Sequence, residues 1–318
     1  SWPILSATRD LIGIAKTGSG KTLAFGLPGL VHVQQRMSEG ERGALMLVLS
    51  PTRELCVQTH TVLAAAGKSS GIRCACIFGG VPKDAQEKLL RAGAEVIVAT
   101  PGRLIDFITS GVAVLSKVSF VVLDEADRML DMGFAPDLKK ILPRTMAKRQ
   151  TAMFSATWPM EVRELAATFL RDPVHVTIGS QKLQANQDVR QIVEVMEPDE
   201  RRARLLALLR EHRKVARKIL VFVLYKREAG EMESLLRRNG YPDAAAIHGD
   251  LTQAKRDEVF SSFKTGNCTL MIATDVAARG LDVPDVDLVV NYTFPLTIED
   301  YVHRIGRTGR AGRQGIAV

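Results

Sequence analysis

Ten short apolar runs, most of them rich in β-branched residues, recur along the chain and are separated by segments with the composition of helices. This alternation is typical of a parallel sheet covered by helices on both faces, because such strands are buried on both sides and form continuous apolar runs. The sequence therefore predicts an α/β fold. The predicted strands are residues 12–15, 44–50, 74–78, 95–100, 120–126 and 151–156, followed by 218–224, 244–249, 269–274 and 288–293.

The alternation is interrupted once, by the polar segment GSQKLQANQDV at residues 179–189. This segment has no sustained apolar period and is typical of an exposed linker. A length of 318 residues fits two domains of roughly 150 residues each. We therefore expect two tandem α/β domains, residues 1–180 and 191–318, joined by a linker at 181–190. Because the chain begins at Ser1 and stops within a strand-like run, we expect a piece of a longer protein.

The composition limits the partners only slightly. The chain has 43 Lys and Arg against 35 Asp and Glu, a net charge of +8 and a pI near 9.4. This favours a polyanionic partner through counterion release, although many basic proteins bind no nucleic acid. The four cysteines lack zinc-site spacing, and no apolar run approaches the roughly 18 residues of a membrane helix. We expect buried, reduced thiols in a soluble, intracellular protein that does not contact a membrane.

The first predicted strand leads directly into KTGSGKT, residues 16–22. Gly18 and Gly20 free the backbone to turn its amides toward one point at a helix N-terminus, where the helix dipole attracts phosphate. In such a loop Lys21 reaches the β- and γ-phosphates, and Thr22 offers a hydroxyl to Mg²⁺. Ala15 replaces the usual first glycine, and a glycine-rich surface turn is the alternative. The predicted nucleotide-binding residues are Ala15, Lys16, Thr17, Gly18, Ser19, Gly20, Lys21 and Thr22.

A second motif, FVVLDEAD, ends an apolar run at residues 120–127. Its carboxylates, Asp124, Glu125 and Asp127, repel one another, and a divalent cation would relieve this repulsion. Asp124 suits the role of a Mg²⁺ ligand, and Glu125 that of orienting or deprotonating the attacking water. An acidic helix N-terminus is the alternative, and it accounts well for Asp127. Both motifs follow strands, at the ends where open α/β sheets bind ligands.

The residues DEAD at 124–127 spell the name of a family, and the chain resembles the DEAD-box ATP-dependent RNA helicases. The resemblance covers nearly the whole chain, with the motifs in the family's order. It implies two RecA-like domains that bind ATP between them and single-stranded RNA across both. The first-domain motifs are AKTGSGKT, PTREL (51–55), Gly79-Gly80, TPGR (100–103), DEAD and Ser155-Ala156-Thr157. The second-domain motifs are VFVLYKREA (221–229), HGDLTQAKR (248–256), TDVAARGLD (274–282) and HRIGRTGR (303–310).

The resemblance assigns a role to the arginine-rich segment HRIGRTGR. It implies that Arg307 and Arg310 are arginine fingers on the γ-phosphate, which join Lys21 and Glu125 in the catalytic set. A disordered basic patch is the alternative for this segment. Asp282 resembles the family residue that contacts the ribose. The residues that the family uses to couple hydrolysis to domain closure are Asp127, Ser155, Thr157, His303 and Arg304.

The same resemblance implies a set of RNA contacts. Arginine forks, hydroxyls and loop amides suit phosphates and 2′-hydroxyls, so recognition of the RNA backbone should dominate. Arg53 and Arg103 have surface salt bridges as their alternative. With 5% aromatic residues and none interleaved with the RNA motifs, no base-stacking platform is expected. The predicted contacts are Thr52, Arg53, Gly80, Thr100 and Arg103, with Gln253, Arg256 and Thr274 in the second domain.

These observations predict an enzyme that uses ATP and Mg²⁺ to separate short RNA duplexes. An ATP-gated RNA clamp with little unwinding activity is the alternative, and a DNA-translocating helicase fits the motifs less well. Stretches such as TAMFSATWPMEVRELA and FPLTIEDYVHRIGRTGRAG resemble members that act on pre-ribosomal RNA in the nucleolus of the nucleus. A monomer aided by an activating protein is expected. The family's adenine-reading glutamine motif precedes the sequence, so the base preference is not predicted.

Overall fold

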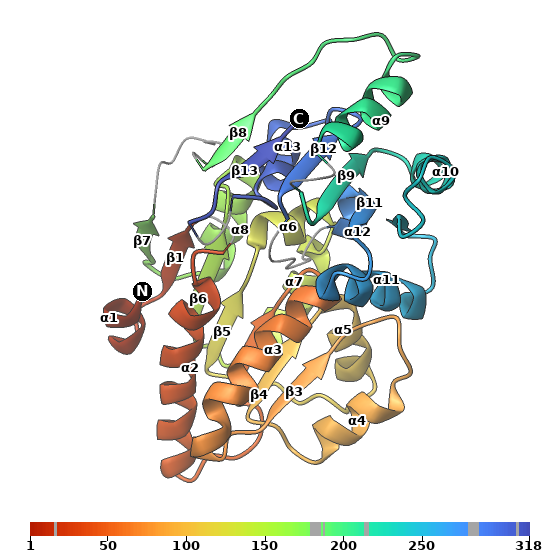
Figure 1. Ribbon diagram of the computed structural model, residues 1–318. Coiled ribbons are helices and arrows are strands. Elements are labelled where there is room, and N and C mark those ends of the chain that lie inside the picture. Colours follow the sequence, from red (N-terminus) through yellow and green to blue (C-terminus); the bar gives the residue numbers. More distant parts are fainter. Residues whose placement is uncertain (16–17, 179–185, 187, 213–215, 279–285, 310–311) are drawn as a thin grey trace. The chain divides into compact units, whose positions relative to one another are not determined.

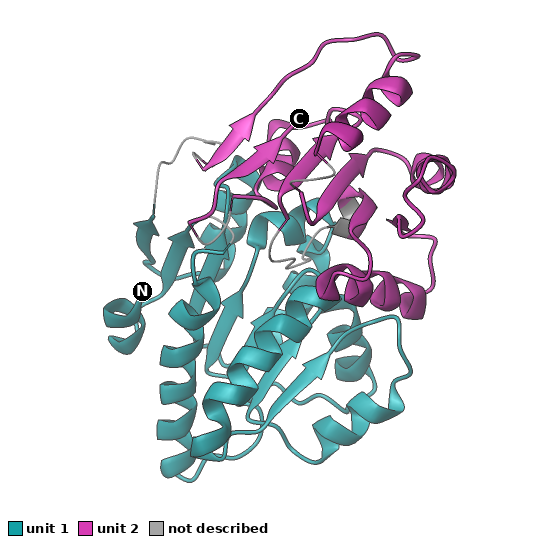
Figure 2. Cartoon of the chain, viewed as in Figure 1, with its two compact units in different colours: residues 1–181 teal, residues 182–318 magenta. Residues whose placement is uncertain are grey.

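The computed structural model describes residues 1–15, 18–178, 186, 188–212, 216–278, 286–309 and 312–318 (Figure 1). The chain divides into two compact units, Ser1–Gln181 and Lys182–Val318 (Figure 2). Each unit contains one sheet, and every described strand pair in both sheets is parallel, so the predicted α/β fold is confirmed. No helix in the described part of the chain is both long and apolar enough to cross a membrane.

The sheet of unit 1 has the strand order β3-β4-β2-β5-β6-β1-β7. Consecutive strands of the chain are therefore often not neighbours, and each connection crosses over through a helix. The strands are β1 (Leu11–Ile14), β2 (Met46–Leu49), β3 (Cys74–Ile77), β4 (Val96–Ala99), β5 (Phe120–Leu123), β6 (Gln150–Ser155) and β7 (Val174–Thr177).

Helices cover both faces of this sheet, and alternate strand residues are buried on opposite sides. In β5, Val121 and Leu123 belong to one apolar cluster, whereas Phe120 and Val122 belong to the other. The first cluster is covered by α5 (Pro101–Thr109), α6 (Ala126–Asp131), α7 (Ala135–Ile141) and α8 (Met160–Phe169). The second cluster is covered by α1 (Trp2–Ser6), α2 (Lys21–Ser38) and α3 (Arg53–Gly67). The remaining helices of unit 1 are α4 (Asp84–Arg91) and the short 3₁₀ helices η1 (Lys68–Ser70) and η2 (Leu142–Arg144).

The sheet of unit 2 has the order β10-β11-β9-β12-β13-β8 and is also buried on both faces. Its strands are β8 (Val189–Gln191), β9 (Ile219–Val223), β10 (Ala245–Ile247), β11 (Leu270–Thr274), β12 (Leu288–Asn291) and β13 (Gly315–Ala317). Its helices are α9 (Arg201–His212), α10 (Lys226–Arg238), α11 (Gln253–Thr265), α12 (Asp275–Ala278) and α13 (Ile298–Ile305).

The structure differs from the predicted elements at three places. The strand predicted at 120–126 ends at Leu123, because Glu125 has left-handed backbone angles and α6 follows at once. Strand β7, at the edge of its sheet, has no fully buried residue and was not predicted. Strand β8 begins at Val189, inside the segment predicted as a linker, because Val189 packs into the apolar core of unit 2. Residues 181–185 and 187 of that segment lie outside the described residues.

The four cysteines are free thiols, as the sequence predicts. Cys56 and Cys268 are buried, whereas Cys74 and Cys76 are partly exposed. Burial is the main reason why the pKa of Cys268 is raised to about 11, so this thiol stays protonated and unreactive at neutral pH.

Candidate nucleotide and RNA site

In unit 1 the predicted site residues follow six different strands. Because all the strands are parallel, their carboxyl ends meet at one edge of the sheet. The glycine loop, the DEAD residues and Ser155 lie at the ends of β1, β5 and β6, which are neighbours. The predicted RNA contacts follow β2, β3 and β4, which are also neighbours. The strand order therefore gathers the predicted nucleotide residues and the predicted RNA residues into adjacent halves of one edge.

The glycine loop connects the buried strand β1 to the 18-residue helix α2. Gly20 is the N-cap of α2, and its φ of 82° falls in the left-handed region that favours glycine. Lys21 donates a hydrogen bond from Nζ to the carbonyl oxygen of Ala15, 3.1 Å away, across the loop. Gly18, Ser19 and Gly20 are exposed, so the start of α2 is open to a ligand. Lys16 and Thr17 lie outside the described residues.

Asp124 follows β5 and is only 2% exposed. Burial raises the pKa of this carboxyl to about 7; the positive charge of Lys21 opposes that rise, and the negative charge of Glu125 adds to it. The positive charge of Lys21 therefore favours the ionised form of Asp124. A divalent cation held there would favour the ionised form of Asp124 in the same way.

The residues present fit Mg²⁺ of the kind that keeps most of its water. The described residues contain no group of three or more His, Cys, Asp and Glu side chains that could enclose a metal ion. Mg²⁺ in nucleotide sites is commonly held by one or two protein oxygens together with phosphates and waters. The hydroxyl of Thr22, in the first turn of α2, and the carboxylate of Asp124 are two such oxygens.

Glu125 differs from its neighbours in backbone and in exposure. Its φ of 52° and ψ of 57° are left-handed, which costs a non-glycine residue on the order of 1 kcal/mol. Its side chain is partly exposed, whereas Asp124 and Ala126 are buried. Strained backbone of this kind is concentrated at functional sites, and here it separates one accessible carboxylate from one buried carboxylate.

Asp127 is held by residues that follow β6. Its Oδ2 accepts hydrogen bonds from the backbone amide of Thr157 at 2.9 Å, from the Thr157 hydroxyl at 2.8 Å and from the amide of Ala156 at 3.2 Å. The amide of Asp127 in turn donates to the hydroxyl of Ser155 at 3.3 Å. These bonds join the first turn of α6 to the end of β6, so a displacement of Ser155 or Thr157 would be transmitted to the DEAD residues.

The RNA half of the edge is built from helix N-termini and stacked arginines. Thr52 caps α3 by accepting a hydrogen bond from the amide of Leu55 at 3.3 Å. The guanidinium of Arg53 lies 4.6 Å from the centre of the Phe78 ring. Arg103 donates to the carbonyl oxygen of Val81 at 2.8 Å and so fixes the loop that contains Gly80. Thr100 is the N-cap of α5, where its side chain makes no capping hydrogen bond.

In unit 2 the predicted RNA residues lie on α11 and at the end of β11. Gln253 is the first residue of α11, and its amide oxygen accepts a hydrogen bond from Arg256 at 3.3 Å. Both side chains are partly exposed at the start of the helix. Thr274, the last residue of β11, is buried, with 4% of its surface exposed. Of the three predicted residues, the two on α11 are the more accessible to a ligand.

Arg304, which the resemblance predicts to tie the two domains together, is buried. It is 1% exposed and donates two hydrogen bonds of 2.6 Å to the two carboxylate oxygens of Asp275. A third bond of 2.7 Å reaches the carbonyl oxygen of Thr293, and the guanidinium lies 5.1 Å from the centre of the Phe222 ring. These bonds all lie within unit 2, and the role of Arg304 in tying the two domains together stays a prediction.

The remainder of the arginine-rich segment is only partly described. His303 is on α13, and Arg307, just beyond that helix, is 7% exposed. Gly309 has a φ of 66°, and a Cβ there would lie 2.6 Å from Val189 of β8. This glycine therefore allows close packing within unit 2. The predicted finger Arg310 and the predicted ribose contact Asp282 lie outside the described residues.

Comparison with known protein families agrees with this geometry. A model described as "DEAD/DEAH box helicase" matches residues 1–165, and one described as "Helicase conserved C-terminal domain" matches residues 200–312. The chain belongs to the DEAD/DEAH box helicase family. The resemblance read from the DEAD residues and the accompanying motifs is thus confirmed.

Individual relatives extend the likeness over the entire chain. It is 55% identical to DEAD-box ATP-dependent RNA helicase 5 of Oryza sativa subsp. japonica and 52% identical to ATP-dependent RNA helicase DBP3 of Saccharomyces cerevisiae, each over 100% of this chain. The chain spans 63% and 61% of the length of these two relatives.

Solved structures of helicases share the tandem RecA-like fold. Mss116p bound to single-stranded RNA and AMP-PNP matches with a TM-score of 0.88 at 29% identity, covering 99% of this chain and 67% of that one. S. cerevisiae Dbp5 bound to RNA and ADP BeF3 matches with a TM-score of 0.82 at 30% identity, covering 97% and 78%.

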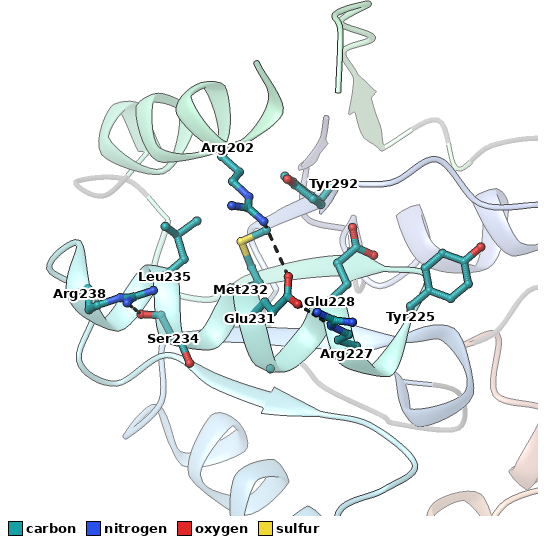
Figure 3. A pocket seen from close by; sticks show the side chains of 11 residues that line it. Arg202, Tyr225, Arg227, Glu228, Glu231, Met232, Ser234, Leu235, Arg238 and Tyr292 are labelled. Atoms are coloured by element: carbon teal, nitrogen blue, oxygen red, sulfur yellow. Dashed lines mark hydrogen bonds and ion pairs between the residues drawn. The ribbon is translucent and has the colours of Figure 1, made fainter. Parts of the chain in front are cut away.

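One aromatic residue in a helicase motif was overlooked in the sequence. Tyr225 of VFVLYKREA is 70% exposed and lines a hollow of about 1200 Å³ beside α10 (Figure 3). Arg202 from α9 and Arg227 from α10 both point at Glu231 in this hollow, with N–O distances of 3.7 and 2.9 Å. The expectation that the RNA motifs provide no base-stacking platform stays a prediction. A tyrosine directly after an apolar strand was the available signal.

Proposed function

We propose that this chain is the catalytic core of an ATP-dependent RNA helicase that couples RNA-stimulated ATP hydrolysis to local unwinding of short duplexes. The observation that carries the proposal is that the exposed glycine loop after β1 and the buried Asp124 after β5 lie at the same edge of one sheet. The names of the relatives, which are RNA helicases, support unwinding over the alternative of a clamp.

In the proposed hydrolysis, the exposed amides at Gly18–Gly20 and the ammonium of Lys21 hold the phosphates. Bound Mg²⁺ would neutralise charge on the β- and γ-phosphates, with Thr22 and Asp124 as its protein ligands. Glu125 orients the attacking water and takes its proton, a role that suits a carboxylate that is more accessible than its neighbours. Each residue has a separate task, so single substitutions should have separable effects.

The proposed RNA surface contacts the backbone more than the bases. Thr52, Arg53 and Arg103 in unit 1, and Gln253 and Arg256 in unit 2, are donors suited to phosphate and ribose oxygens. Sequence-independent binding follows from such contacts, because phosphates carry no base information. Gly80, Thr100 and Thr274 complete the proposed set.

Coupling of hydrolysis to RNA binding would use the hydrogen bonds around Asp127. Ser155 and Thr157 form hydrogen bonds with Asp127, so a displacement at the end of β6 would also displace the DEAD residues. We propose that residues 1–180 and 191–318 act as the two halves of the enzyme, with Arg307 and Arg310 as arginine fingers. His303 would assist at the same interface, and Arg304 would act as a positioning residue for Asp275 and α12.

The pathway is a further part of the proposal. We infer action on pre-ribosomal RNA in the nucleolus, supported by the resemblance of TAMFSATWPMEVRELA and neighbouring stretches to members that work there. An activating protein is also proposed, since a structural relative, S. cerevisiae Dbp5, is bound to Gle1. Recovery of pre-ribosomal RNA after crosslinking of the tagged protein in cells would support this pathway, and recovery of mature messenger RNA alone would contradict it.

The proposed activity is tested by measuring ATP hydrolysis and strand separation with and without RNA. Lys21→Ala should abolish both activities, because the phosphates lose their cation. Glu125→Gln should bind ATP and RNA but lower turnover by about 10²- to 10⁴-fold, the usual contribution of a general base. ATP hydrolysis that RNA does not stimulate, or normal turnover in Glu125→Gln, would overturn the assignment. Retention of RNA without strand release would favour the clamp.

A further inference from the structure

A basic hollow lies in unit 1 at the end of the sheet opposite the motifs. It has a volume of about 500 Å³ and is formed by residues that precede β1, β5, β6 and β7, together with two residues of α2. Since the motif residues follow these parallel strands, residues that precede them belong to the amino edge. The lining residues are Thr8, Arg9, Asp10, His32, Arg36, Ser119, Met146, Lys148, Arg149, Gln150 and Arg171.

Five of these eleven residues are cationic and one, Asp10, is acidic. The carboxylate of Asp10 is used by the backbone, because it accepts hydrogen bonds from the amides of Thr151 at 2.8 Å and of Arg171 at 2.7 Å. Asp10 therefore fixes the starts of two strand segments, and its charge offsets only part of the positive charge around it.

Two of the five cations have carboxylate partners outside the lining. Arg9 pairs with Asp172 at 2.7 Å, and Arg36 pairs with Glu41 at 3.3 Å. The ion pairs found among the described residues include none for the other three cations, which are Lys148, Arg149 and Arg171. These three make up a positively charged cluster at the amino ends of β6 and β7.

The contacts of this cluster leave donors available. Arg171 donates to the carbonyl oxygen of Arg149 at 2.6 Å, and Arg149 reaches the carbonyl oxygen of Leu142 at 3.4 Å. The Nε of Arg149 is buried and has no hydrogen-bond partner among the described residues. Burial lowers the pKa of Arg149, and the neighbouring charge of Arg171 lowers it further. An anion between these guanidinium groups would satisfy the donors and relieve the repulsion.

We propose that this hollow binds a phosphate group of an RNA backbone, as a second RNA contact on the amino edge of unit 1. This inference rests on the proposed function, which already brings RNA to the carboxyl edge. No Phe, Tyr or Trp lines the hollow, and the ring of His32 is hydrogen-bonded to Ser119 at 2.7 Å and lies 5.6 Å from the ring of Phe120. Guanidinium and ammonium groups recognise phosphate without reading sequence. An RNA long enough to leave the motif surface would gain this contact, and a short one would not.

The test uses Lys148→Glu in the full chain. Lys148 is exposed, so reversing its charge should leave the fold intact. Lys68→Glu is the matched control, because Lys68 is also exposed and follows α3, whose end lies at the same edge, but does not line the hollow. Binding is measured against salt concentration for single-stranded RNAs of increasing length, beginning with the shortest RNA that fully stimulates ATP hydrolysis.

Lys148→Glu should weaken binding of the long RNAs and lower their salt slope by about 0.7, the value for one lost phosphate contact on a single strand. Binding of the shortest RNA should match that of the Lys68→Glu control. Arg171→Gln, which keeps a donor for the Arg149 carbonyl, should repeat the effect on the long RNAs. Equal salt slopes for Lys148→Glu and Lys68→Glu on every RNA would overturn the proposal.

Failure of this inference can be told apart from failure of the proposed function. If RNA does not stimulate ATP hydrolysis by the wild-type chain, the proposed function fails. If stimulation is normal but the long RNAs show no dependence on Lys148, only the second contact fails. Binding of inorganic phosphate that depends on Lys148, without any effect of RNA length, would assign the hollow to a free phosphate compound and overturn the RNA assignment.

Discussion

Asp124 in unit 1 and Arg304 in unit 2 are both charged motif residues with almost no exposed surface, at 2% and 1%. Arg304 is matched by a carboxylate that accepts two hydrogen bonds of 2.6 Å. Among the described residues, Asp124 accepts one bond, from the amide of Glu125 at 3.1 Å, and burial raises its pKa to about 7. The charge of the buried arginine is therefore neutralised by a carboxylate of its own unit. The charge of the buried aspartate is not neutralised in this way, and a bound cation would stabilise it.

This difference separates two kinds of motif residue. A side chain whose hydrogen bonds are completed within its unit holds the fold, and its removal should lower stability first. A buried side chain whose charge has no partner in its own unit can interact with a charged ligand. Its removal should lower catalytic activity more than it lowers folding stability. The DEAD residues contain both kinds, since Asp127 accepts three hydrogen bonds at Oδ2 and Asp124 does not.

Among the arginines of HRIGRTGR, the largest effect on ATP hydrolysis is expected for Arg307→Ala. If Arg307 is an arginine finger, its loss should lower kcat for ATP hydrolysis by about 10³-fold or more, because charge on the transferred phosphoryl group is no longer neutralised. Steady-state hydrolysis at saturating RNA measures this effect. A kcat within a few-fold of wild type would place Arg307 with the structural arginines and break the comparison.

Arg304→Ala should act mainly on stability. It leaves the carboxylate of Asp275 without its partner in a site that is 17% exposed, and breaking a buried ion pair costs about 3 to 5 kcal/mol. Denaturant unfolding of the full chain, followed by a probe in unit 2, measures this loss. The transition of unit 1 serves as the internal control. If the unit 2 transition is unchanged but ATP hydrolysis is lost, Arg304 acts between the two domains and does not stabilise unit 2.

Substitutions of the two aspartates should have opposite effects on stability. Asp127→Asn turns an acceptor toward three donors into an amide, and we expect a loss of about 1 to 3 kcal/mol. Asp124→Asn removes a buried charge and should leave stability unchanged or raise it, while ATP hydrolysis is lost. Thermal unfolding in the presence of a chelator compares the two variants. Equal destabilisation by both would remove the distinction.

The smallest effect concerns an ion pair of unit 1 that is half exposed. Burial alone would raise the pKa of Glu95, but its hydrogen bonds with Arg73 outweigh burial and hold the pKa below the ordinary value of 4.5. A lowered pKa stabilises the fold above the ordinary value, and this stability is lost as pH falls through the folded pKa. Arg73→Ala should remove about 1 kcal/mol at neutral pH, because the guanidinium of Arg73 is 56% exposed and the buried Glu95 keeps its hydrogen bond of 2.9 Å from the Arg73 backbone amide.

The pH dependence distinguishes this pair from simple packing. In wild type the unfolding free energy of unit 1 should fall below about pH 4.5, and in Arg73→Ala that part of the slope should be reduced. Urea unfolding over a pH series measures both. Arg73→Lys keeps the charge and is the matched control. Identical slopes in wild type and Arg73→Ala would show that the pair does not contribute.

The sequence by itself determined the fold class, the family and the place of most candidate residues. Continuous apolar runs such as VVL in β5 indicate strands buried on both faces, and charged or glycine-rich segments directly after them indicate the ligand edge. Two edge strands, β7 and β8, escaped this reasoning, because β7 is only partly buried and β8 is three residues long within a polar segment. Short, half-exposed strands carry too few apolar residues to differ from loops.

Tertiary structure alone decided which charged residues are already neutralised. In the sequence, nothing distinguishes the arginines of HRIGRTGR from one another. The folded structure shows that Arg304 forms hydrogen bonds with Asp275, 29 residues earlier in the chain. The strand order likewise could not be read from the chain, yet it places β5, β6 and β1 side by side and so brings Lys21 near Asp124. Sequence patterns report local burial and composition, whereas charge pairing depends on contacts between segments that only the folded chain brings together.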